Sequence, residues 1–258
     1  MTDPAFLRRQ FLATPFTIRN ERRDFHAWRR GRSHYLLWAL DVDTPAVRAR
    51  VAAAQHALTG LLLDGYARQP HVTLALCGFP ARSGRPAHDE FDFERIAAQL
   101  AALQTANPGG FDIEIGGLES FSSAPFLHVE DDGTALATLR RCLHAEAAHP
   151  QGPYVPHVTV GLYADAWPTA AVAQRFEPLA DTPRLHCRIT HLSLMGYVAA
   201  EIGGTLFKVA DYGLDDGHLH WHASASALLD HDVALSGHTA ARDPGLLHAP
   251  RHARTEAT

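Results

Sequence analysis

The sequence predicts an α+β fold: an internal pseudo-twofold repeat of antiparallel sheets, flanked by helices, around a central cleft. Two observations predict it. The tetrapeptide Pro-His-Val-Thr stands at 70–73 and again at 156–159. Around each copy the apolar pattern runs in one order: strand, helix, Pro-His-Val-Thr strand, helix, strand. Because chance does not readily explain that matched order, we predict a duplication over about 35–117 and 125–195, with the two equivalent strands facing each other across the cleft.

The first repeat opens with an apolar run at 34–41, which has the length of a buried strand. Thr44 is a suitable N-cap and Pro45 a suitable first residue for the helix that follows. Apolar residues recur along this helix at helical spacing and give it one apolar face: Val47, Val51, Ala54 and Leu58. After the first Pro-His-Val-Thr strand, the pattern predicts a helix over 92–103 and a half-buried strand over 111–115.

The second repeat begins with a strand-like run at 125–131, and a helical pattern follows over 133–149. Beyond the second Pro-His-Val-Thr strand, the sequence predicts a short helix over 168–176 and a strand over 184–194. A last strand over 205–214 closes the folded part.

These elements divide the chain into three parts. Residues 1–33 form a lead-in segment that is rich in basic and aromatic residues, and residues 34–214 form the duplicated domain. Residues 215–258 are rich in histidine and lack any sustained period, so we expect a loosely ordered tail.

Composition excludes some functions. A formal charge of −5 argues against broad, non-specific attraction to nucleic acid, although a local basic groove remains compatible with it. No apolar stretch approaches the roughly 18 residues of a membrane helix. The three cysteines are odd in number and show no CxxC spacing, which is typical of reduced thiols. We expect a cytoplasmic monomer with no membrane partner.

The two His-x-Thr pairs carry the chemistry. On a strand, residues i and i+2 share a face about 7 Å apart, so His71 points with Thr73 and His157 points with Thr159. Two imidazoles that face each other can act as general base and general acid near neutral pH. Each threonine hydroxyl can donate a hydrogen bond to an oxyanion between them. In-line displacement at phosphorus needs this set of groups.

At these residues the chain resembles the 2H phosphoesterase superfamily, which includes the 2′-5′ RNA ligase-like proteins and RNA 2′,3′-cyclic phosphodiesterases. The family mark is a pair of strand-borne His-x-Thr/Ser-x motifs with an apolar fourth residue, and 71–74 and 157–160 both match. Over about 34–214, the resemblance implies the two-lobed LigT-like fold and a phosphodiesterase that needs no metal or cofactor. It implies substrates with a 2′-phosphate ester: 2′,3′-cyclic ends, 2′-5′-linked nucleotides or related cyclic phosphates, with reverse 2′-5′ ligation as a related activity.

By the same resemblance, the catalytic residues are His71, Thr73, His157 and Thr159, with His157 as base and His71 as acid. The near-symmetry of the motifs leaves the reverse assignment open. One position departs from the family. Some RNA-acting members have an arginine five residues after the second histidine, whereas this chain has Leu162. A cation must then come from elsewhere if the substrate is an oligonucleotide.

One possible source is 19–35, where six arginines are interleaved with Phe25, Trp28 and Tyr35. Such interleaving can hold a phosphate backbone and stack bases, and we include Tyr35 among the expected substrate contacts. A solvated segment that leads into the first strand is an equally good interpretation.

Two further residues are expected to line the cleft. Trp38 and His128 occupy equivalent places in the strands that open the two repeats, where they can contact base or ribose. Ordinary core packing is the alternative for both.

Two other functions compete with the phosphodiesterase. One is a nucleotide-binding or RNA-binding module that has lost turnover, although both motifs are intact here. The other is a zinc hydrolase, suggested by the alternating histidines in the tail: His218, His220 and His222. We expect no metal site, because no cysteine stands near these histidines.

Overall fold

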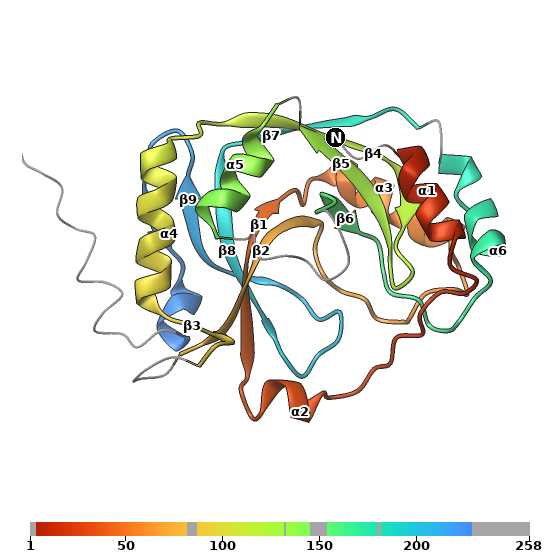
Figure 1. Cartoon of the computed structure of the whole chain (residues 1–258), viewed down its shortest axis with the longest axis horizontal. Coiled ribbons are helices and arrows are strands. Elements are labelled where there is room, and N and C mark those ends of the chain that lie inside the picture. Colours follow the sequence, from red (N-terminus) through yellow and green to blue (C-terminus); the bar gives the residue numbers. More distant parts are fainter. Residues whose placement is uncertain (1–3, 82–86, 132, 145–153, 180–181, 229–258) are drawn as a thin grey trace, which may run out of the picture.

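The computed structural model describes residues 4–81, 87–131, 133–144, 154–179 and 182–228. Most of the described strands form one sheet in the order β10-β9-β8-β1-β2-β6-β5-β4-β7, and these neighbours are all antiparallel (Figure 1). The strands are β1 (His34–Asp41), β2 (His71–Pro80), β3 (Glu90–Phe91), β4 (Phe111–Ser120), β5 (Pro125–Asp131), β6 (His157–Thr159), β7 (Leu185–Ile189), β8 (His191–Val198), β9 (Phe207–Gly213) and β10 (Leu219–Trp221). Short β3 pairs with β2 in parallel, off this path. The α+β antiparallel fold that the sequence predicts is confirmed, but the two Pro-His-Val-Thr strands are hydrogen-bonded neighbours in one sheet and do not face each other across a cleft.

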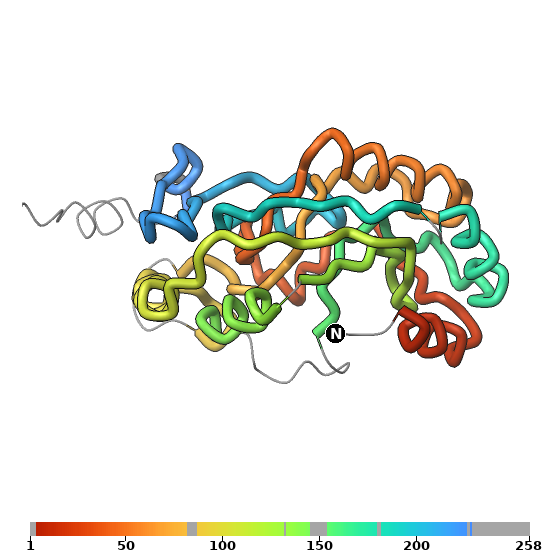
Figure 2. Tube along the Cα trace, turned by 90° about the horizontal axis from the view of Figure 1, so that it is seen from above, coloured from red at the N-terminus to blue at the C-terminus, as the bar shows by residue number. Residues whose placement is uncertain are grey.

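The helices lie on both sides of the strongly twisted sheet. Figure 2 shows α3 on one side and α1, α4 and α5 on the other. The α-helices are α1 (Pro4–Leu12), α2 (His26–Arg29), α3 (Pro45–Ala57), α4 (Phe93–Ala106), α5 (Ala135–Cys142) and α6 (Thr169–Gln174), and the 3₁₀ helices are η1 (Glu177–Leu179) and η2 (Ala223–Ala227). No helix in the described ranges is long and apolar enough to cross a membrane.

Local sequence explains where the long helices begin. Thr44 caps α3, because its hydroxyl accepts a hydrogen bond from the backbone N–H of Val47, and Pro45 occupies the first turn. Asp92 caps α4 in the same way by accepting from the N–H of Arg95 at 2.9 Å. Both helices therefore start within a residue or two of their predicted positions.

The sheet is symmetric about its centre, where β2 and β6 are neighbours. On one side of this pair lie β1 and then β8, and on the other side lie β5 and then β4. Each sequence repeat thus places its last strand beside the other repeat. The run at 184–194, which the sequence predicts as one strand, is broken at Thr190 into β7, which pairs with β4, and β8, which pairs with β1.

One face of the central strands packs into the main core. Val72 and Val158 are fully buried there, together with Trp38 and Leu127. Residues that alternate with them on β2 and β6 point to the other face, which carries the His-x-Thr pairs. Because of this alternation, the histidine and threonine side chains of β2 and β6 lie outside the main core, although the strands themselves are largely apolar.

The sheet extends beyond residue 214, into the segment expected to be loosely ordered. β10 pairs with β9, and η2 follows it. The rest of that expected tail, 229–258, lies outside the described residues. At the other end, Phe11 of α1 is buried and its ring packs on Phe176 with the centroids 5.9 Å apart.

Candidate functional site

The two Pro-His-Val-Thr segments meet at the centre of the sheet. β2 and β6 pair with Val72 opposite Val158. Antiparallel pairing about this register places His71 opposite Thr159 and Thr73 opposite His157. Opposite residues are about 5 Å apart and successive residues on one face about 7 Å apart, so the four side chains outline a rectangle that a phosphate group fits.

Both histidines are held in the same way. The Nδ1 atom of His71 lies 2.8 Å from the carbonyl oxygen of Gln69, and that of His157 lies 2.7 Å from the carbonyl oxygen of Val155. A carbonyl only accepts, so each Nδ1 donates and carries the proton of the neutral ring. Nε2 is then the nitrogen that takes up or releases the reacting proton. In each motif the carbonyl belongs to the residue two positions before the histidine.

The two imidazoles differ in their surroundings. His71 is 6% exposed, and burial lowers its pKa from 6.5 to about 4, with smaller lowering by the charges of Arg68 and His157. His157 is half-buried, and its ring packs beside Phe121 at 5.1 Å and Phe126 at 5.2 Å between centroids. His71 is therefore neutral at physiological pH.

Two tyrosines contact the threonines of the two motifs. The side chain of Thr159 lies close enough to the Tyr66 hydroxyl to lower the pKa of Tyr66, although burial has the larger effect and raises it. The hydroxyl of Tyr154 donates to the backbone carbonyl of Thr73 at 2.8 Å. The guanidinium of Arg140 lies over the Tyr154 ring, 3.6 Å from its centroid. These contacts fix the strand ends around the rectangle.

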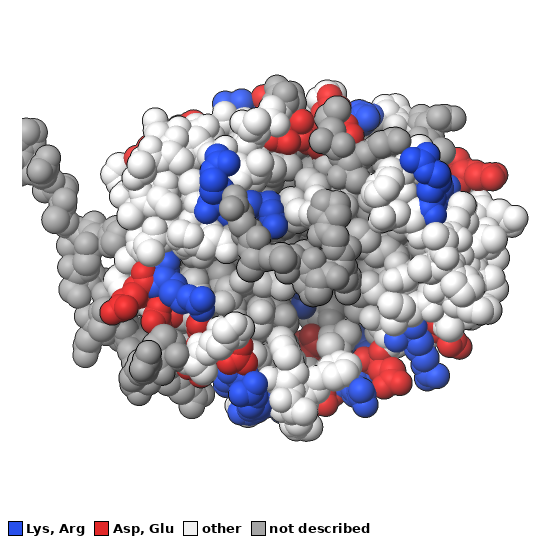
Figure 3. Space-filling view, viewed as in Figure 1, with Lys and Arg blue, Asp and Glu red and all other residues white. Residues whose placement is uncertain are grey.

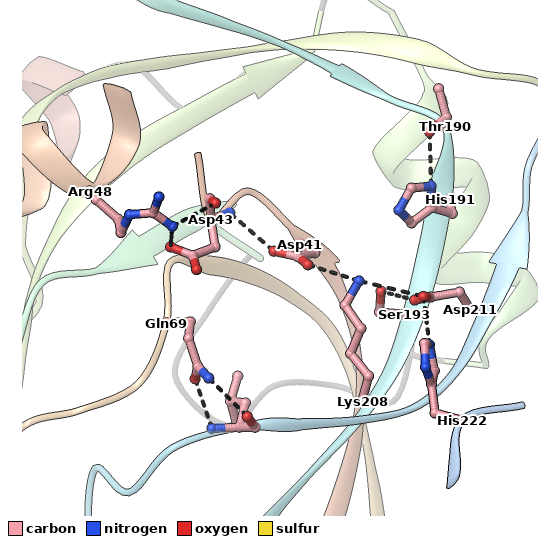
Figure 4. Close-up of polar contacts among 11 residues, drawn as sticks. Asp41, Asp43, Arg48, Gln69, Thr190, His191, Ser193, Lys208, Asp211 and His222 are labelled. Carbon is pink, nitrogen blue, oxygen red and sulfur yellow. Dashed lines mark hydrogen bonds and ion pairs between the residues drawn. The ribbon is translucent and has the colours of Figure 1, made fainter. Parts of the chain in front are cut away.

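Figure 4 shows a polar network that includes Asp41 of β1 and both Lys208 and Asp211 of β9. Asp41 is the register partner of His71, and its carboxylate is 2.9 Å from Nζ of Lys208. Lys208 also lies 3.4 Å from Asp211, which binds Nε2 of His222 at 2.8 Å. A cavity of about 110 Å³ opens here, and its lining includes His71, Asp41 and Lys208. The carboxylate of Asp41 beside His71 is therefore already paired with the ammonium group of Lys208.

The expectation that Trp38 lines the cleft is wrong. Trp38 is 0% exposed, belongs to the main core, and donates its indole N–H to the side-chain oxygen of Gln99 on α4 at 2.8 Å. Its ring therefore lies on the face of β1 opposite to His71. Core packing, the alternative interpretation, is the correct one for this residue.

His128 stands closer to the motif residues. It is the register partner of His157 on β5, so it shares the same face of the sheet. It is 4% exposed and its Nδ1 is 3.6 Å from the carboxylate of Glu130. Burial lowers the pKa of His128. Its position permits a contact with substrate only from beside His157.

Tyr35 lies in an aromatic cluster at the far end of β1. Its ring is 5.6 Å from that of Tyr197 and 5.3 Å from that of Trp28. Arginines in 19–35 are partly engaged by carboxylates, as Arg32 shows by binding Asp89 at 2.7 Å and 3.0 Å. This segment therefore uses part of its positive charge within the fold.

Three residues of the site were not identified from sequence: Tyr66, Arg68 and Tyr154. Arg68 and Tyr154 each stand three positions before a motif histidine, which is a signal visible in the sequence. Leu162 is the residue at which the sequence departs from the pattern of the resembled family. Its backbone carbonyl accepts a hydrogen bond from the N–H of Leu63 at 2.7 Å.

The charges on the molecular face that Figure 3 presents are mixed. Basic and acidic side chains are interspersed there rather than gathered into one basic patch. Within the described ranges no three His, Cys, Asp or Glu side chains are grouped so that they could hold a metal ion. In the histidine-rich segment, His222 binds Asp211 and His218 lies 3.7 Å from Asp216.

Comparison with known proteins identifies the family of the chain. The model of the 2′-5′ RNA ligase superfamily matches residues 43–201. No significant match was found among curated proteins. Similar solved structures include Escherichia coli LigT complexed with 3′-AMP (15% identity, 70% of this chain and 98% of that chain covered, TM-score 0.46). They also include the same protein complexed with NADP+ (16%, 71% and 99%, 0.42) and a phosphoesterase (14%, 70% and 98%, 0.41).

Proposed function

The chain belongs to the 2′-5′ RNA ligase superfamily, and we propose that it is a phosphodiesterase that hydrolyses 2′,3′-cyclic phosphates or 2′-5′-linked nucleotides. One observation carries this proposal. The β2–β6 register brings two imidazoles and two threonines onto one face, within the span of a phosphate group.

The different surroundings of the two histidines indicate which one acts as general base and which one acts as general acid. A general base must be neutral before the reaction, and burial keeps His71 neutral because its pKa is lowered to about 4. We therefore assign His71 as the base and His157 as the acid, which reverses the assignment drawn from the family resemblance.

Hydrolysis of a 2′,3′-cyclic phosphate then proceeds in one balanced step. Nε2 of His71 takes a proton from water while the water oxygen forms a bond to phosphorus. The bond from phosphorus to one ribose oxygen breaks, and His157 gives its proton to that oxygen. His71 ends protonated and His157 neutral, and proton exchange with solvent restores the starting state.

The charge on the phosphate oxygens is stabilised by the protein itself in this proposal. Hydroxyls of Thr73 and Thr159 donate to the non-bridging oxygens, as donors in an oxyanion hole do. We propose that no metal is needed for this step. His128 beside His157, and Tyr35 beside Tyr197, stay proposed contacts to ribose and base.

The test is turnover against a panel of 2′,3′-cyclic mononucleotides, 2′-5′ oligoadenylates and RNA with a cyclic end, with and without a chelator. We expect hydrolysis of at least one class, and chelation should leave its rate unchanged. Tight binding with no turnover on the whole panel would favour the alternative, a nucleotide-binding module. A rate abolished by chelation and restored by zinc would contradict the metal-independent step.

Variants connect any turnover to the site. His71→Ala and His157→Ala should each lower kcat by at least ~10², the lower end of general acid–base contributions. The double variant should cost much less than the product of the two, because the residues act as a unit. His186→Ala is the matched control, since this side chain is 72% exposed on β7. Folded variants that keep full activity would remove the histidines from the mechanism.

A further inference from the structure

Arg68 occupies a rigid position at the entrance to β2. It follows Ala67, whose N–H donates to the carbonyl of Gly203 at 2.8 Å. It precedes Gln69, whose side chain accepts from the backbone N–H of Leu206 at 2.8 Å and donates to the carbonyl of Leu206 at 3.0 Å. The residues on both sides of Arg68 are thus held, Ala67 through its backbone and Gln69 through its side chain, so the side chain of Arg68 starts from a defined point.

The guanidinium of Arg68 lies against the side chain of Tyr197 and interacts with its hydroxyl as well as its ring, but it contacts no carboxylate in the described part of the chain. Its central carbon lies 4.1 Å from the ring centroid of Tyr197. Its Nε is buried and has no hydrogen-bond partner among the described residues. Other partly buried arginines, such as Arg8 and Arg32, form ion pairs with carboxylates, whereas no ion pair of Arg68 occurs in the described part of the chain. A partly desolvated cation in this state favours binding of an anion.

This cation lies beside the motif residues. Its charge contributes to lowering the pKa of His71, and it opposes the larger effect of burial, which raises the pKa of Tyr66. Arg68 also stands three residues before His71 in the chain, so its guanidinium lies on the His71 side of the site.

The equivalent position of the second motif has no such cation. Tyr154 stands three residues before His157, as Arg68 stands three residues before His71. The arginine over the Tyr154 ring, Arg140, donates to the backbone carbonyl of Leu74. That guanidinium already holds a strand of the sheet, which distinguishes it from Arg68.

We propose that Arg68 is a phosphate-binding residue, whose guanidinium donates to a non-bridging oxygen of the phosphate between His71 and His157. The inference rests on the proposed function for the location of the phosphate and adds the residue that binds its charge. A guanidinium presents a planar pair of donors that matches two phosphate oxygens, whereas an ammonium does not.

The experiment measures binding of inorganic phosphate, adenosine 2′-monophosphate and adenosine by calorimetry to wild type, Arg68→Gln and Arg68→Lys. Arg68→Gln should bind the two phosphate probes about 10- to 100-fold more weakly, the range for a lost charged hydrogen bond. Arg68→Lys should recover part of this loss, and binding of adenosine should not change. Arg141→Gln on α5 is the matched control, because that exposed arginine lies outside the site.

A second readout does not depend on any ligand. Because the charge of Arg68 lowers the pKa of His71, Arg68→Gln should raise that pKa in an NMR titration, and Arg68→Lys should not. Circular dichroism identifies any variant that fails to fold.

The outcomes separate the two proposals. If phosphate binding depends on Arg68 but no cyclic or 2′-5′ substrate is hydrolysed, the proposed function fails and the phosphate site stands. If substrates are hydrolysed and folded Arg68→Gln binds and turns over like wild type, only the inference on Arg68 fails. A wild-type protein that binds neither phosphate probe contradicts it as well.

Discussion

Because His71 is buried, its protonation should largely determine how the free energy of unfolding and the rate of turnover depend on pH. The pKa of His71 falls from 6.5 in the unfolded chain to about 4 in the native protein. Between these values the unfolded chain binds a proton that the native protein does not, so stability is complete above pH 6.5 and is lost as pH falls towards 4.

The lowered pKa sets the size of the effect. Protonating His71 in the native protein costs roughly 3 kcal/mol more than in the unfolded chain, and about 2 kcal/mol of this appears between pH 7 and pH 5. The side chain is 6% exposed, so solvent screening reduces the figure little. If His71 is the base, kcat/KM should stay level on its acid side down to about pH 5 and then fall tenfold for each pH unit below 4.

The assay is urea unfolding of wild type and His71→Asn at pH 7 and pH 5. Asparagine keeps an N–H donor for the carbonyl of Gln69 but does not titrate. Other histidines with lowered pKa values, His34 and His128, are present in both proteins, so their effects cancel. Wild type should lose about 2 kcal/mol more than the variant on acidification. Equal losses in the two proteins, or an acid limb of kcat/KM near pH 6.5, would refute the reasoning.

Three further changes test the surroundings of the site. Thr159→Val removes an oxyanion donor and should lower kcat about 10²-fold, measured on the best substrate. Gly203→Ala should destabilise the protein by about 1–2 kcal/mol in urea unfolding, because Gly203 has φ +70 and a Cβ there would lie 2.8 Å from the ring of Tyr66. Lys208→Met leaves the Asp41 carboxylate without its cation and should raise the pKa of His71, which NMR titration measures; an unchanged pKa would show that Asp41 does not act on His71.

The order of elements was predictable because it depends on local signals. Caps such as Thr44 and Asp92 and the alternation around each His-x-Thr pair are written in neighbouring residues. Strand partners are set by contacts far along the chain, and no local pattern shows them. The run at 184–194 reads as continuous strand, and only pairing with β4 before Thr190 and with β1 after it divides that run.

The face on which Trp38 points was not predictable for a related reason. Both faces of β1 are covered, one by the main core around Trp38 and one by a small cluster that includes Leu37 and Ala39. An apolar strand buried on both faces shows no alternation that would assign a residue to either. Only the pairing settles the faces: Asp41 lies opposite His71, and counting back along β1 from Asp41 then places Trp38 on the other face.

The two histidines of a duplicated motif need different protonation states, and the residues around the motifs provide the difference. Two imidazoles in identical surroundings would titrate alike, whereas an acid–base pair needs one neutral and one protonated ring. The repeats hold both rings by the same carbonyl contact, but they differ three residues upstream, where Arg68 borders His71 and Tyr154 precedes His157. A nearby cation and deep burial both disfavour a proton on His71, while the second motif has a neutral phenol at the matching place. The same arginine that we propose to bind the phosphate would therefore also help to divide the two histidines into base and acid.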